Sequence, residues 1–65
     1  MMPIGSGVRY RQWLGRVVRK SAEQRRAWPR SHVAVLIDGV VHQIPYRSLT
    51  YVARRYADAV AWEAR

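Results

Sequence analysis

The sequence predicts a small α+β domain of two layers, built from an N-terminal helix, a β-hairpin at about 32–44 and a C-terminal helix at about 48–63. Three observations predict it. Apolar residues recur at helical spacing near the N-terminus, an Asp-Gly pair separates two apolar runs in the middle, and a second helical stripe follows. A chain of 65 residues has room for one core, so we expect both helices to lie on the hairpin in a single domain over 8–65.

The first segment, 1–7, reads MMPIGSG. Pro3, Gly5, Ser6 and Gly7 crowd into five residues of it. Residues of this kind interrupt regular structure, and chain termini are poorly ordered unless they are tied down. We therefore expect a flexible lead-in.

The segment 8–27 is expected to be the first helix. Its apolar residues stand at the i, i+3, i+4, i+7 and i+8 positions of one helical face, and Trp28-Pro29 ends the element because a residue before proline avoids the α region. A strand remains the alternative, since apolar and polar residues alternate over 8–11 and two β-branched residues follow later. The face comprises Tyr10, Trp13, Leu14, Val17 and Val18.

Asp38-Gly39 gives the strongest local signal in the chain. It joins the apolar runs 32–37 and 40–44, and Asp-Gly supplies the two positive φ angles of a type I′ turn. The two-residue loop fixes the register and pairs Ile37 with Val40, and so on outward. The core face is then Val33, Val35, Ile37, Val40, His42 and Ile44.

The second helix is expected to begin after Pro45, with Ser48 as its N-cap. Its apolar stripe comprises Leu49, Val52, Ala53, Tyr56 and Val60.

The charge is uneven along the chain. Residues 1–30 hold eight basic residues against Glu23 alone, whereas residues 31–65 are close to neutral, and the chain as a whole carries +8. Such an asymmetry indicates a polyanionic partner, most simply nucleic acid. The expected phosphate contacts are Arg9, Arg11, Arg16, Arg19, Lys20, Arg25, Arg26 and Arg30.

Four further residues are candidates for contact with a partner. Two tryptophans and two arginines lie outside the main stripes, where aromatic rings and guanidinium groups anchor interfaces or stack on bases. They are Trp28, Arg54, Arg55 and Trp62.

No catalytic constellation is recognisable, and we expect no enzyme, no cofactor and no metal. There is no cysteine. The hairpin register points His32 and His42 to opposite faces, and Asp58 and Glu63 do not share a helical face, so neither a metal site nor an acid–base pair can be assembled.

The chain has no apolar run of the ~20 residues that a membrane span requires, and its start lacks the pattern of a signal peptide. We therefore expect a cytoplasmic protein. A lone hairpin and a thin core are marginal in water, which favours a homodimer.

The stretch LIDGVVHQIPYRSLTYVARRYA resembles a module of small bacterial and phage-borne, DNA-associated proteins of unknown function. There an Asp-Gly hairpin is followed by Tyr-Arg-Ser-Leu-Ser/Thr, which opens a helix. About a third of the chain is covered, and DAVAWEAR stands where the family continues with Thr-Gly and an Asn-Gly-aromatic stretch. The resemblance implies a DNA-associated accessory role and no activity. The matching residues are Asp38, Gly39, Tyr46, Arg47, Ser48, Leu49, Thr50, Ala53 and Arg54.

These observations lead to two alternative hypotheses. The first is a small, non-enzymatic nucleic-acid-binding protein that contacts phosphates through its Arg-rich N-terminal half, with an affinity that falls by roughly 10³ or more between about 50 and 200 mM salt. The second is a small interaction protein, phage-encoded in this interpretation, that docks on an acidic surface of a host protein and inhibits or redirects it. A membrane-surface role for the first helix is a third and weaker alternative.

Overall fold

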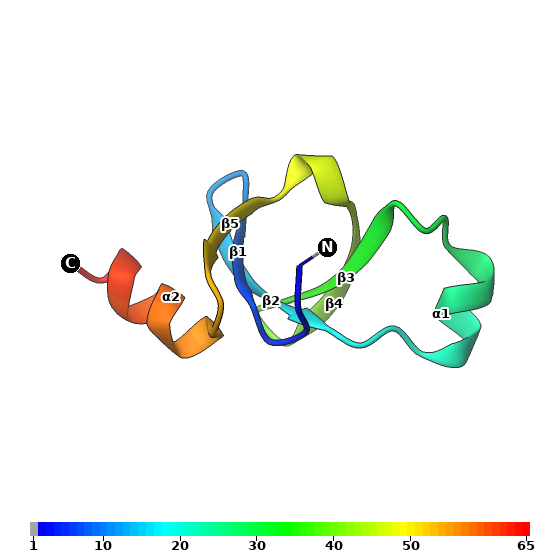
Figure 1. The fold of residues 1–65 in the computed structure, drawn as a ribbon, viewed down its shortest axis with the longest axis horizontal. Coiled ribbons are helices and arrows are strands. Elements are labelled where there is room, and N and C mark those ends of the chain that lie inside the picture. Colours follow the sequence, from blue (N-terminus) through cyan, green and yellow to red (C-terminus); the bar gives the residue numbers. More distant parts are fainter. Residues whose placement is uncertain (1) are drawn as a thin grey trace.

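The computed structural model describes residues 2–65, and its main element is one five-stranded antiparallel sheet. The strands follow the order β4-β3-β2-β1-β5, and the sheet curls into a ring (Figure 1). The molecule is elongated, with extents of 39 × 19 × 19 Å. Helix α1 lies at one end of the long axis and α2 at the other. The elements are β1 (Gly7–Tyr10), β2 (Trp13–Val18), α1 (Ala22–Ala27), β3 (His32–Ile37), β4 (Val40–Pro45), η1 (Tyr46–Ser48), β5 (Thr50–Ala53) and α2 (Tyr56–Glu63).

The predicted arrangement of helix, hairpin and helix is wrong, and its first error is the N-terminal helix over 8–27. That segment forms β1, β2 and the short α1. Tyr10 and Trp13 are cross-strand partners on either side of a tight turn, with their rings stacked 6.4 Å apart. Two apolar residues three positions apart can therefore lie on one face of a helix or pair across a hairpin turn. The alternation over 8–11 was the better guide, and Arg11 takes a positive φ of 56° in the turn.

The second error is the C-terminal helix over 48–63. Ser48 ends the 3₁₀ turn η1 and caps no helix, and β5 follows before α2 begins at Tyr56. Thr50 and Tyr51 have the β-branched and aromatic side chains that strands favour, and β1 supplies their pairing partner. The helix expected from the resemblance after Tyr-Arg-Ser-Leu is likewise replaced by η1 and β5.

The β3–β4 hairpin is confirmed in position and register. Ile37 pairs with Val40, and the ladder continues outward to His32 and Pro45. Asp38 and Gly39 have φ angles of 50° and 78°, as a type I′ turn requires.

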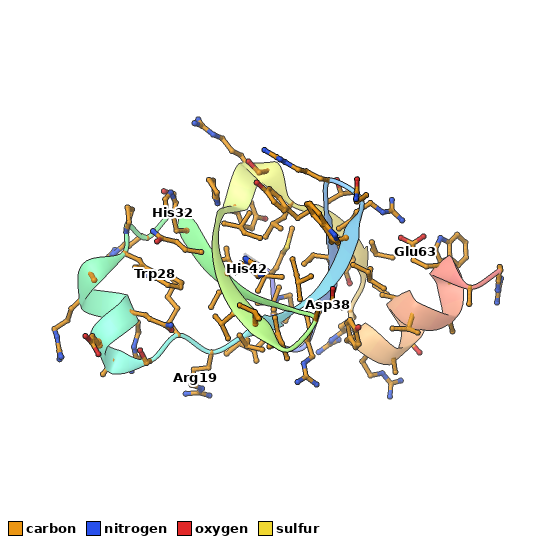
Figure 2. The ribbon with its side chains drawn as sticks, turned by 180° about the vertical axis from the view of Figure 1, so that it is seen from behind. Arg19, Trp28, His32, Asp38, His42 and Glu63 are labelled. Atoms are coloured by element: carbon orange, nitrogen blue, oxygen red, sulfur yellow. The ribbon has the colours of Figure 1, made fainter. Side chains whose placement is uncertain are left out.

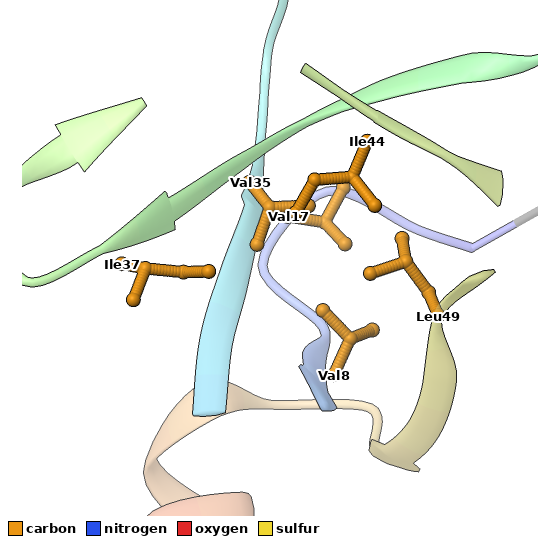
Figure 3. Close-up of a cluster of buried hydrophobic side chains, with 6 residues drawn as sticks. All are labelled: Val8, Val17, Val35, Ile37, Ile44 and Leu49. Atoms are coloured by element: carbon orange, nitrogen blue, oxygen red, sulfur yellow. The ribbon is translucent and has the colours of Figure 1, made fainter. Parts of the chain in front are cut away.

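The core lies inside the curled sheet and draws on β1, β2, β3 and β4 and on Leu49, which lies between η1 and β5 (Figure 3). Gly15 lets the sheet close tightly, because a methyl group there would lie 2.5 Å from Val35 Cγ1. Val40 and His42 were expected on the core face but are exposed, since β4 is an edge strand and nothing covers its turn end. The core residues are Val8, Val17, Val35, Ile37, Ile44 and Leu49.

The segment expected as a flexible lead-in is joined to the sheet from Pro3 onward. Gly5 N–H donates to Val17 O at 2.8 Å, and Val17 N–H donates to Ser6 O at 3.0 Å. Ser6 is fully buried. Residues 3–7 therefore extend the domain, and Met1 lies outside the described residues.

Candidate functional site

An open groove separates α1 from the adjacent end of the sheet, with a volume of about 1150 Å³. Its walls come from four places: the N-terminal segment, the β2–α1 connection, α1 with the loop that follows it, and the β3–β4–η1 end of the hairpin. Most of its lining is apolar. The apolar and aromatic lining includes Met2, Ile4, Val18, Trp28, Val33 and Tyr46.

Helix α1 is positioned by its caps, since none of its residues is buried. Ser21 and Gln24 form a capping box, in which Gln24 N–H donates to Ser21 Oγ at 3.0 Å and Ser21 N–H donates to Gln24 Oε1 at 2.9 Å. The pair satisfies two backbone donors that a helix start leaves without partners. The far end is closed by Trp28 N–H, which donates to Gln24 O at 2.8 Å.

Trp28 is the largest side chain of the groove wall on the α1 side. It is half-buried and has an extended backbone, as Pro29 requires of the residue before it. His32 N–H then donates to Pro29 O at 3.0 Å, which ties the loop to the start of β3. Figure 2 shows Trp28, His32 and Arg19 together at the α1 end of the molecule, far from Glu63 on α2.

The hairpin register brings the η1 turn to the same groove. His32 pairs with Pro45, and the next residue outward, Tyr46, donates its N–H to Ser31 O at 2.7 Å. Gln43 Nε2 donates to His32 Nδ1 at 2.6 Å. This contact ties the first residue of β3 to the neighbouring strand β4.

Five basic side chains surround the groove, and none of the chain's four acidic residues lines it. Asp38 lies at the hairpin turn, Asp58 and Glu63 lie on α2 at the opposite end, and Glu23 is in the first turn of α1, outside the lining. Over residues 2–65 the ion pairs are Arg9–Glu63 and Arg55–Asp58, both away from the groove. The lining of the groove is therefore positively charged, and none of its basic side chains is in an ion pair. Its basic residues are Arg19, Lys20, Arg25, Arg30 and Arg47.

Four of the eight predicted phosphate contacts line the groove, and four lie outside it. Arg19, Lys20, Arg25 and Arg30 line the groove, whereas Arg26 stands exposed on α1 outside its lining. The other three belong to the β1–β2 hairpin, where each has a local partner. Arg9 pairs with Glu63, Arg11 lies 5.3 Å from the Tyr10 ring centroid, and Arg16 lies 5.9 Å from that of Tyr56.

The predicted partner contacts are also separated. Trp28 lies in the groove, but Arg54, Arg55 and Trp62 lie at the α2 end. Arg55 is 3.6 Å from Asp58. Trp62 is 63% exposed, and the Arg65 guanidinium lies 5.4 Å from the centroid of one of its rings. These residues form no continuous surface with the groove.

Sequence reasoning missed three groove residues: His32, Tyr46 and Arg47. The sequence does contain the information that places them, because the register set by Asp38-Gly39 advances by one residue on each strand with every pair. Continued outward past its last predicted pair, it places 46 opposite 31 and so brings η1 beside the basic loop at Arg30.

Across residues 2–65, no group of three or more His, Cys, Asp or Glu side chains is placed to hold a metal ion. The same part of the chain contains no helix that is long and apolar enough to cross a bilayer. Comparisons with protein-family models, with curated proteins and with solved structures gave no significant match for this chain.

Proposed function

We propose that this protein binds nucleic acid non-enzymatically and that the groove between α1 and the sheet is its binding site. One observation carries the proposal: five basic side chains from four separate segments converge on a groove that no carboxylate lines. Arg and Lys side chains that converge in this way match a chain of phosphates, and Arg can bind a phosphate through two parallel hydrogen bonds.

The proposal is narrower than the Arg-rich N-terminal half expected from the sequence. Arg9, Arg11 and Arg16 are outside the groove lining and contact Glu63, Tyr10 and Tyr56, respectively, so they are left out of the site. Arg47, from the nearly neutral half, enters it.

Salt dependence tests the proposal directly. Each phosphate neutralised releases condensed counterions, so five cations predict that affinity falls by about 10²-fold to 10³-fold between about 50 and 200 mM salt. Fluorescence anisotropy of labelled oligonucleotides measures this. An absence of binding at the lower salt concentration, or an affinity that hardly changes with salt, contradicts the proposal.

The exposed edge of the sheet favours a second candidate function, docking on another protein. Strand β4 is an edge strand, and its Val40 and Val41 are 56% and 44% exposed. An edge strand presents unpaired backbone groups that can accept a strand from a partner, and the expected homodimer would use the same edge. Val41→Lys should disrupt such pairing and leave nucleic-acid binding in the groove unchanged. Sedimentation of the wild type and of Val41→Lys measures self-association through this edge, separately from nucleic-acid binding.

A further inference from the structure

We propose that the groove selects single-stranded over double-stranded nucleic acid, with one base stacked on the Trp28 ring and its flanking phosphates on the basic side chains of the lining. This inference rests on the proposed function and names the form of nucleic acid that the site takes.

The composition of the groove is the first argument. A site for duplex phosphates alone needs cations on a polar surface, because a duplex presents phosphates outward and keeps its base faces stacked inside. Here the cations share one lining with apolar side chains that include Val18, Val33 and the Trp28 ring. Only a ligand with both phosphates and exposed flat apolar faces can use the apolar and the basic side chains together.

The placement of Trp28 is the second argument. The α1 C-terminal hydrogen bond to Gln24 O and the following Pro29 hold its backbone in one conformation. The Trp28 ring is half-buried and lines the open groove. Tyr46 adds a second ring to the same lining and is 42% exposed. Aromatic rings of this kind stack on any base, so the site should tolerate many sequences.

The third argument is the distribution of the basic residues, which come from both sides of Trp28 in the sequence. Arg19 and Lys20 precede α1, Arg25 is in its last turn, Arg30 follows Trp28, and Arg47 stands on η1. Charges thus precede and follow the tryptophan in the sequence, and all five line the same groove, so a base on Trp28 would have cations nearby for its flanking phosphates.

Anisotropy titrations of the full chain with labelled oligo-dT of about 12 nucleotides, and with a mixed-sequence duplex of the same length, test the inference. We expect the single strand to bind about tenfold more tightly. Trp28→Ala should weaken single-strand binding about tenfold and duplex binding much less, whereas Trp28→Phe should restore most of the single-strand binding. The matched control is Trp62→Ala, which removes an exposed tryptophan at the other end of the molecule.

A fluorescence measurement keeps the test independent of folding defects in the alanine variant. In Trp13→Phe/Trp62→Phe, Trp28 is the remaining tryptophan, and stacking on a base should quench its emission in step with binding of oligo-dT. Equal binding of duplex and single strand, or binding without quenching, overturns the inference but leaves the proposed function standing. Binding of neither form at low salt overturns both.

Discussion

Ala59 of α2 lies so close to Gly7 of β1 that a methyl group at position 7 would stand 2.2 Å from the Ala59 Cβ atom. Both residues are buried. This contact seats α2 on the first strand and permits the ion pair between Arg9 and Glu63 beside it. The absence of a side chain at Gly7 thus determines where α2 packs.

Gly7→Ala should therefore destabilise the protein by about 1–3 kcal/mol, the usual cost of overpacking a well-packed contact. Urea unfolding followed by circular dichroism measures this loss. The double variant Gly7→Ala/Ala59→Gly moves the methyl group from helix to strand and should recover part of the loss beyond what the two single changes predict. Strict additivity of the two changes would show that the contact is not the cause.

Ile44 supplies the second stability prediction. It is 3% exposed and packs in the core inside the curled sheet, whereas Ile4 is 59% exposed. Ile44→Val should cost about 0.5–1.5 kcal/mol because it leaves a small cavity. The same chemical change at Ile4 should stay within about 0.5 kcal/mol of the wild type. Thermal unfolding of the two variants compares them directly, and equal shifts would contradict the placement of the core.

The hairpin could be predicted because its cause is local. Asp38-Gly39 dictates the turn, the turn dictates the register, and no distant residue is needed. Strand β5 could not be predicted in this way, since Thr50–Ala53 becomes a strand only by pairing with β1, which lies near the other end of the chain. Its apolar residues fitted a helical stripe equally well. Where two periods fit the same residues, the long-range partner decides, and the sequence alone does not name it.

The groove was predictable only in part, for the same reason. Arg25, Trp28 and Arg30 are near in sequence and could be grouped from composition. Arg9 lies outside the groove because β1 pairs with β5, far along the chain. Arg47 lines the groove because the β3–β4 hairpin brings η1 back beside Ser31. Local charge density therefore predicted a positively charged surface in this half of the chain but not which basic residues line the groove.

Arg47 and Arg54 make a matched pair for the proposed site. Both are exposed arginines in the nearly neutral half of the chain, but Arg47 lines the groove and Arg54 does not. Arg47→Gln should weaken binding to all sequences and make the slope of log affinity against log salt shallower by about 1, the value for one lost phosphate contact. Arg54→Gln should leave the slope unchanged. If the two changes have equal effects, the contact surface is diffuse and the groove is not the site.

Ser21 links the stability of α1 to binding. Ser21→Ala removes the acceptor for Gln24 N–H and should destabilise α1 by about 1 kcal/mol. Because α1 has six residues and buries none of them, this loss should leave global unfolding nearly unchanged. The groove wall would then be formed in only a fraction of molecules, and the apparent affinity falls by that fraction, about twofold to fivefold.

Hydrogen exchange at Arg25 N–H, which donates to Ser21 O at 2.9 Å, should become faster in parallel. Ser48→Ala is the control, since Ser48 was the N-cap expected from the sequence and η1 has no side-chain capping bond. An affinity that is unchanged while Arg25 N–H exchanges faster would show that α1 forms no part of the binding wall.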